Sequence, residues 1–101
     1  MAAAIIDIDG TMVFWGTYNF LPGAVESVRA FMEAGNEVIF VTQREPDALL
    51  HRMLGKSFPG CHLIENISSP RILINDAGVA CVHHPKDGPW TYDLTGIAAQ
   101  A

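Results

Sequence analysis

The chain has 101 residues, half of them hydrophobic, and a formal net charge of −5 at pH 7. This length predicts one domain covering residues 1–101, with enough apolar side chains for a core and too many for a disordered chain. The negative charge argues against nucleic acid as a partner, and no apolar run approaches the ~20 residues of a membrane span. Because the N-terminus lacks a basic signal-peptide segment, we expect a cytoplasmic protein.

The first half of the chain alternates apolar runs with a helical pattern. Residues 3–8 predict a strand that is apolar on both faces, as in a parallel sheet covered by helices. The aromatic segment 12–21 is either a short hairpin that covers a site as a lid or a surface loop tucked onto the core. A first helix follows, with Pro22 in its first turn and Gly35 at its end. Residues 38–41 predict the second strand.

A second helix is predicted from Pro46 to about Gly55. Residues 61–64 predict a short third strand, and residues 71–75 predict a fourth, while residues 80–83 are a candidate for a fifth. The weakly patterned end of the chain is compatible with a last strand and a short C-terminal helix. This order predicts a single α/β domain of three layers, Rossmann-like, with a mostly parallel sheet and no room for a cap domain.

Polar residues follow three of the predicted strands. Asp7 and Asp9 close the first, Thr42 closes the second and Asp76 closes the fourth. The carboxyl ends of parallel strands share one edge of a sheet, so these side chains are expected in one crevice. Two acids at positions i and i+2 repel each other unless a cation or a shared proton joins them. This pair therefore predicts a functional site.

The motifs in this order resemble those of the haloacid dehalogenase-like superfamily of phosphohydrolases. Residues 7–11, Asp-Ile-Asp-Gly-Thr, resemble its first motif. Residues 38–42 and 72–76 resemble its second and fourth motifs, each an apolar strand with a polar end. The resemblance covers residues 3–84 and implies a small capless phosphatase.

The resemblance implies a Mg²⁺-dependent phosphomonoester hydrolase. Asp7 would attack the phosphoryl group and form an aspartyl-phosphate, while Asp9 would act as general acid and base. Thr42 would donate a hydrogen bond to a phosphoryl oxygen, and Gly10 would let the backbone turn beside it. Mg²⁺ would bind Asp7, the backbone carbonyl of Asp9, and Asp76.

The remaining roles stay open at this stage. The family's third motif supplies a cation beside the phosphoaspartate, and either Arg71 or Lys56 is the candidate, unless the position is vacant. Gln43 and Arg44 follow the second motif and are candidate substrate-binding residues, although Arg44 is equally compatible with plain solvent exposure. The fourth motif carries Asn75 where many relatives have an acid.

Two further questions concern partners and activity. A capless protein would take a small phosphorylated substrate, and a homodimer is compatible with its small core and exposed aromatic residues. Trp15 and Tyr18 either contact that substrate or simply pack. The rival interpretation is a catalytically degenerate relative with a binding or assembly role. Histidines and two cysteines do not match the spacing of a structural zinc site, and both cysteines are expected to be buried free thiols.

Overall fold

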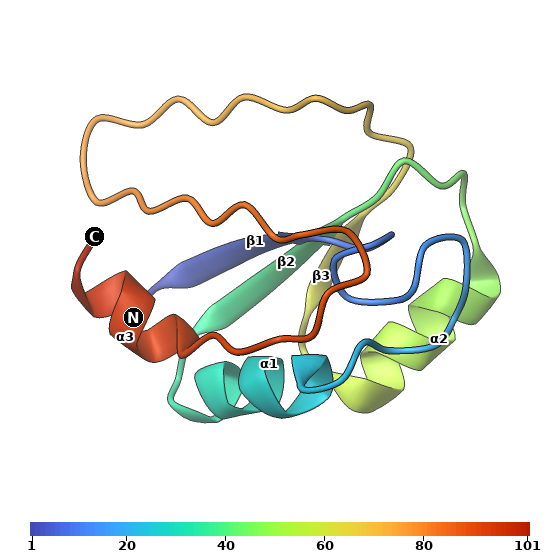
Figure 1. Cartoon of the computed structure of the whole chain (residues 1–101), viewed down its shortest axis with the longest axis horizontal. Coiled ribbons are helices and arrows are strands. Elements are labelled where there is room, and N and C mark those ends of the chain that lie inside the picture. The colour runs from blue at the N-terminus through green and yellow to red at the C-terminus, as the bar shows by residue number, and fades with distance from the viewer.

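The computed structural model describes all residues from 1 to 101 and shows an α/β fold (Figure 1). Its three strands pair in parallel in the order β1-β2-β3, and the register aligns Asp7 with Val41 and Val41 with Ile64. The carboxyl ends of all three strands therefore lie at one edge. The elements are β1 (Ala3–Asp7), α1 (Ala24–Glu33), β2 (Glu37–Val41), α2 (Ala48–Ser57), β3 (His62–Ile64) and α3 (Leu94–Ala99).

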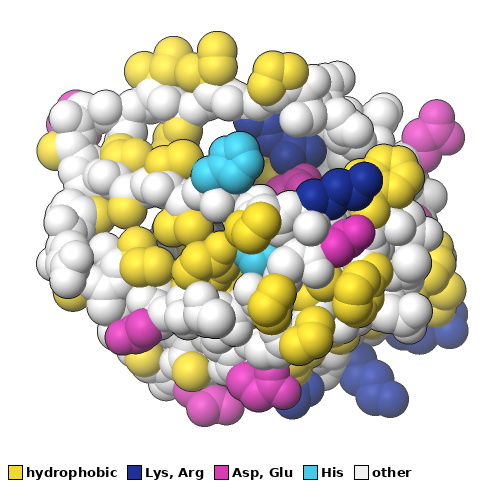
Figure 2. Space-filling model, in the orientation of Figure 1, with side chains coloured by type: hydrophobic (Ala, Val, Ile, Leu, Met, Phe, Trp, Pro, Cys, Tyr) yellow, Lys and Arg dark blue, Asp and Glu magenta, His cyan; other side chains and the backbone are white.

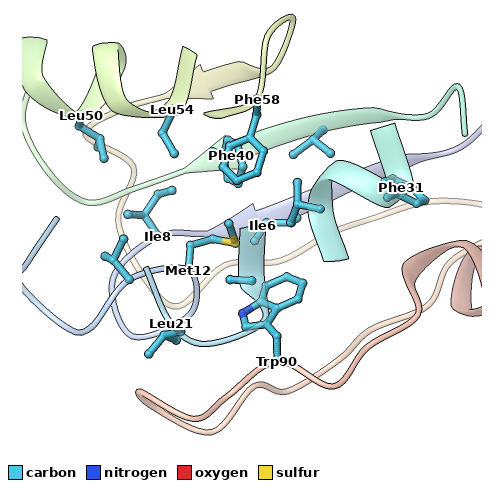
Figure 3. Close-up of a cluster of buried hydrophobic side chains, with 14 residues drawn as sticks. Ile6, Ile8, Met12, Leu21, Phe31, Phe40, Leu50, Leu54, Phe58 and Trp90 are labelled. Carbon is cyan, nitrogen blue, oxygen red and sulfur yellow. The ribbon is translucent and has the colours of Figure 1, made fainter. Parts of the chain in front are cut away.

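The predicted parallel sheet with alternating helices is confirmed, but its layering differs from the prediction. The three helices lie on one side of the sheet (Figure 1). Ile6 and Phe40 point from the strands into this side and meet Phe31, Leu54 and other core side chains (Figure 3). On the opposite face Ile5 of β1 is exposed. The molecule thus has two layers, and the expected three-layer arrangement is not formed.

Local sequence explains where both long helices begin. Asp47 caps α2, because its carboxylate accepts hydrogen bonds from the backbone N–H groups of Leu49 at 3.0 Å and Leu50 at 3.1 Å. Gly23 precedes α1 with a φ of 82°, a conformation that favours glycine. Each helix starts two residues later than predicted, since Pro22 and Pro46 lie in the preceding turns.

The aromatic segment 12–21 forms a short hairpin. The backbone N–H of Leu21 donates to the carbonyl of Met12 at 2.8 Å, and that of Phe14 donates to the carbonyl of Asn19 at 2.9 Å. Met12 is fully buried at the base, whereas Trp15 near the tip is 61% exposed. The hairpin therefore packs onto the core and also presents aromatic side chains to solvent.

The strands predicted at 71–75 and 80–83, and the one after Trp90, are wrong. Residues 66–83 form an extended loop above the sheet (Figure 1), and hydrophobic side chains stand along that margin of the molecule (Figure 2). Ile72 is 88% exposed and Ile74 is 90% exposed. The outer edge of β1 has no partner strand.

The C-terminal segment returns to the core, and the short helix predicted there is confirmed as α3. The indole N–H of Trp90 donates to the carbonyl of Thr11, and its backbone N–H donates to that of Pro22 at 2.9 Å. Cys61 is half-buried, and burial raises the pKa of its thiol. Cys81 is exposed, so the expectation of a buried thiol is wrong for this residue. None of the helices is long and apolar enough to cross a membrane.

Gly23 offers a test of how the C-terminal segment packs. A Cβ atom at Gly23 would lie 2.6 Å from the carbonyl oxygen of Trp90, whereas one at Gly35, whose φ is 94°, would meet nothing within 4 Å. Both substitutions with alanine pay roughly 1–2 kcal/mol for a left-handed backbone. We expect Gly23→Ala to lower the free energy of unfolding in urea by roughly 2 kcal/mol more than Gly35→Ala. Equal losses would contradict the packing of Trp90 on this turn.

Candidate functional site

A polar pocket of about 210 Å³ lies at the carboxyl edge of the sheet. The pocket is lined by residues from the end of β1 and the hairpin after it, from the turn after β2 and from the long loop: Asp7, Asp9, Trp15, Gln43, Ser69 and Arg71. A larger hollow of about 310 Å³ lies between α1 and residues 92–95, and it contains none of the predicted site residues. Of the four residues expected in one crevice from the strand order, Asp7 and Asp9 line the smaller pocket, whereas Thr42 and Asp76 do not. Gln43, a candidate substrate-binding residue, also lines it, and this makes it the candidate site.

Asp7 is the last residue of β1, and two side chains hold its carboxylate. Arg71 donates from Nη1 to Oδ1 at 2.8 Å, and the hydroxyl of Thr11 donates to Oδ2 at 3.2 Å. Asp7 is aligned in the sheet with Val41, so its backbone is fixed by the ladder. A carboxylate oriented in this way beside a cation can serve as a nucleophile.

Asp9 is held by the guanidinium of Arg44. Nε of Arg44 donates to Oδ2 at 3.0 Å and Nη2 donates to Oδ1 at 2.6 Å, a bidentate pair. Burial by itself would raise the pKa of the Asp9 carboxyl, but the hydrogen bonds from Arg44 and from the N–H of Gly16, with the charge of Arg44, lower it below its ordinary value. This direction does not favour the general-acid part of the role that the resemblance implies for Asp9, since an acid must hold a proton near neutral pH.

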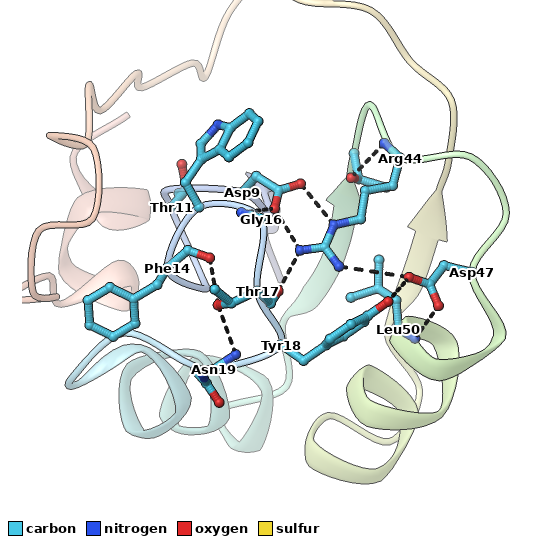
Figure 4. Close-up of polar contacts among 12 residues, drawn as sticks. Asp9, Thr11, Phe14, Gly16, Thr17, Tyr18, Asn19, Arg44, Asp47 and Leu50 are labelled. Atoms are coloured by element: carbon cyan, nitrogen blue, oxygen red, sulfur yellow. Dashed lines mark hydrogen bonds and ion pairs between the residues drawn. The ribbon is translucent and has the colours of Figure 1, made fainter.

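Arg44 also joins the hairpin to α2 (Figure 4). It donates to the carbonyl of Thr17, its guanidinium lies 4.9 Å from the ring centre of Tyr18, and it pairs with Asp47 at 3.8 Å. The Tyr18 hydroxyl donates to the same Asp47 carboxylate. Arg44 does not line the pocket, so its contacts are structural in this conformation, while its neighbour Gln43 does line it.

Thr42 occupies a position different from the one that the motif implies. Its side chain is fully buried and does not line the pocket. The hydroxyl accepts a hydrogen bond from the backbone N–H of Arg44 at 3.1 Å, and the Thr42 carbonyl accepts one from Ile67 at 2.9 Å. Thr42 therefore shapes the turn after β2, and a bound phosphoryl group would have to draw the hydroxyl out of that turn.

Of the two candidate cations, the structure places Arg71 at the site. Arg71 contacts Asp7 directly, whereas Lys56 lies in the last turn of α2. Since α2 runs from the carboxyl edge of β2 back to the start of β3, Lys56 is at the opposite edge of the sheet.

The Arg71–Asp7 ion pair also explains why residues 71–75 do not pair with β1. In a parallel strand beside β1, residue 71 would lie near Ala3 and Asn75 near Asp7. At a rise of about 3.3 Å per residue, residues 71 and 75 would be roughly 13 Å apart. The ion pair instead fixes Arg71 at the end of β1, so it and the predicted strand exclude each other.

Asp76 does not join the pocket. It lies in the exposed loop, and the chain contains no group of three or more His, Cys, Asp or Glu side chains placed to hold a metal ion. The expected set of Asp7, Asp9 and Asp76 is therefore not assembled in this structure. The two carboxylates that line the pocket still suit Mg²⁺, because this ion is commonly bound by one or two carboxylates, with water and phosphate oxygens as its other ligands.

The loop 85–90 supports the site from outside, a role that the sequence did not reveal. The Asp87 carboxylate accepts a hydrogen bond from the N–H of Trp15 at 2.7 Å, and the Asp87 N–H donates to the carbonyl of Gly10 at 2.9 Å. Gly10 has a φ of 78°, and a Cβ there would lie 3.3 Å from Cγ of Lys86. The turn after β1 therefore requires glycine. No local pattern in the sequence indicates this role, because the partners of Asp87 are more than 70 positions away.

No family model, curated protein or solved structure matches the chain.

The ion pair between Arg44 and Asp9 should make the stability of the fold depend on pH. The pKa of Asp9 is lowered in the folded protein, so the pair stabilises the fold above the ordinary carboxyl pKa and this contribution disappears as acid protonates Asp9. We expect Arg44→Leu to lower the free energy of unfolding by roughly 1–2 kcal/mol at pH 7, with the difference from wild type shrinking below about pH 4. Urea titrations of both proteins at several pH values measure this difference in the free energy of unfolding.

Arg52 is the matched control, because it lies exposed on α2 outside the ion pairs of the chain. Arg52→Leu should show no such pH dependence. A loss in Arg44→Leu that is the same at pH 7 and pH 3 would contradict the assignment to Asp9.

Proposed function

We propose that the chain is a Mg²⁺-dependent phosphomonoester hydrolase that acts through an aspartyl-phosphate on Asp7. The observation that carries the proposal is the joint presence of Asp7, Asp9 and Arg71 in one pocket, with Arg71 2.8 Å from the Asp7 carboxylate. The sequence resemblance supports the same chemistry. The substrate would be a small phosphorylated molecule in the cytoplasm, and a homodimer is part of the same proposal.

Asp7 performs the first step. Its carboxylate oxygen forms a bond to phosphorus while the bond from phosphorus to the alcohol oxygen breaks, and the alkoxide leaves. Arg71 stays beside the carboxylate and offsets the charge that gathers on the phosphoryl oxygens. Thr11, which donates to the other carboxylate oxygen, orients the attacking atom.

Asp9 acts chiefly in the second step. A water oxygen attacks phosphorus, Asp9 accepts the water proton, and the bond from phosphorus to Asp7 breaks, which frees inorganic phosphate. The lowered pKa keeps the Asp9 carboxylate ionised and able to accept a proton, although it also makes that carboxylate a weak base. Asp9 is a poor donor in the first step, so substrates with acidic leaving alcohols, such as aryl phosphates, should react fastest.

The proposal includes Mg²⁺ because the pocket offers oxygen ligands. The Asp7 carboxylate lines the pocket and offers the hard oxygen ligands that Mg²⁺ prefers, and the backbone carbonyl of Asp9 would be the second protein ligand, as the resemblance implies. When bound, the ion would lower the repulsion between a phosphate and the carboxylates.

The rival proposal is a catalytically degenerate protein that binds a phosphorylated ligand or assembles with a partner. Its supporting observation is that each acid already has an arginine partner, Arg71 for Asp7 and Arg44 for Asp9. An acid neutralised in this way can be purely structural.

The nucleophile is tested with an aryl phosphate and Mg²⁺. We expect Asp7→Asn to abolish turnover, because an amide cannot form the aspartyl-phosphate. Chelation of Mg²⁺ should have the same effect. Asp76→Asn is the matched control, since Asp76 lies in the exposed loop, and it should keep both the rate and the half-saturating Mg²⁺ concentration.

Equal rates for wild type and Asp7→Asn would contradict the nucleophile. If the wild type is inactive, beryllofluoride with Mg²⁺ decides between the proposals, and failure to form an adduct on Asp7 supports the rival. A marked rise in the Mg²⁺ requirement of Asp76→Asn would show that Asp76 reaches the metal when it is bound.

Arg71 and Lys56 are distinguished by parallel substitutions. We expect Arg71→Met to lower kcat roughly 10²–10³-fold, the usual cost of one preorganised donor at a developing charge. Lys56→Met should leave kcat unchanged, because Lys56 lies at the other edge of the sheet. The opposite pattern would reject Arg71 as the cation of this site.

A further inference from the structure

The size of the pocket limits what it can enclose. Its volume of about 210 Å³ is smaller than the roughly 300–1,000 Å³ of pockets that surround a whole small-molecule ligand. With Asp7 and Arg71 in the lining, the phosphoryl end of a substrate occupies this space. The remainder of the ester must therefore rest on the rim.

Trp15 is the large apolar surface of that rim. It lines the pocket and is 61% exposed, although an indole normally packs where it is out of water. The other exposed aromatic residues of the hairpin differ from it. Phe14 does not line the pocket, and the hydroxyl and ring of Tyr18 are occupied by Asp47 and Arg44.

The indole is also held in place without being buried. Its backbone N–H donates to Asp87 at 2.7 Å, and Nζ of Lys86 lies 5.4 Å from the ring centre in a cation–π contact. A flat, preorganised ring binds another ring at little entropic cost.

Cations concentrate around the same rim. The chain has only six Lys and Arg residues and a net charge of −5, yet Arg71 lines the pocket and Lys86 lies over the Trp15 ring. Lys86 takes part in none of the ion pairs of the chain. Its ammonium group therefore has no acidic partner and lies over the indole of Trp15.

We propose that Trp15 and Lys86 form a recognition platform for a planar aromatic group on the alcohol side of the phosphomonoester, as in a nucleoside monophosphate. The aromatic group stacks on the indole while its phosphate points toward Asp7 and Arg71. The inference rests on the proposed function for the placement of the phosphate. Binding of the aromatic group to Trp15 does not require that the ester is hydrolysed.

The test compares adenosine 5′-monophosphate with ribose 5-phosphate, which carries its phosphate on the same ribose carbon but has no aromatic base. Isothermal titration calorimetry without Mg²⁺, which the proposed hydrolysis requires, measures both dissociation constants. We expect the wild type to bind the nucleotide about ten-fold more tightly, the usual gain from stacking one base on an aromatic side chain. The nucleotide should also quench the fluorescence of Trp15, since Trp90, the other tryptophan, is buried.

Trp15→Leu should bind the two ligands equally, whereas the matched variant Phe14→Leu should keep the ten-fold preference. A preference that survives in Trp15→Leu, or no binding of either ligand to the wild type, overturns the platform. Hydrolysis of aryl phosphates without any preference for the nucleotide overturns it too and leaves the proposed function standing. Selective nucleotide binding without hydrolysis supports the platform and rejects the proposed function.

Discussion

The structure depends on how the chain neutralises two carboxylates at the end of one strand. Asp7 and Asp9 lie two positions apart at the end of β1, where two negative charges repel each other. Each is joined to one guanidinium, Asp7 to Arg71 and Asp9 to Arg44. Because the two arginines come from different downstream segments, these pairs tie the turn after β2 and the start of the long loop to β1.

The two pairs have different consequences for chemistry. The Arg44 pair is bidentate and lies within a network that includes Tyr18, so Asp9 is kept ionised and its proton affinity is low. The Arg71 pair uses a single contact to one oxygen of Asp7, and the other oxygen has only the hydroxyl of Thr11. Asp7 is therefore the more readily released of the two, as a nucleophile must be, whereas Asp9 can act only where a base is needed.

Local patterns predicted the elements whose partners are near in sequence. The first three strands and both long helices follow from apolar runs and turn residues, and the pocket at their shared edge follows from parallel pairing. Residues 71–75 show the limit of this reasoning. Their β-branched pattern predicts a strand, but a strand also needs an edge in the right register, and the long-range contact of Arg71 with Asp7 decides that register. Asp87 was missed for the same reason.

Arg71 therefore links the architecture to the chemistry. If residues 71–75 paired with β1, the sheet would cover the exposed Ile72 and Ile74 and bring Asp76 toward Asp7, but Arg71 would move to the opposite edge. The present arrangement keeps a cation at the nucleophile and leaves the metal without Asp76. One segment cannot supply both the arginine and the third acid to the same pocket. If activity depends on Arg71, the present arrangement persists when substrate and metal are bound. If activity depends on Asp76 instead, residues 71–75 pair with β1 in the bound state.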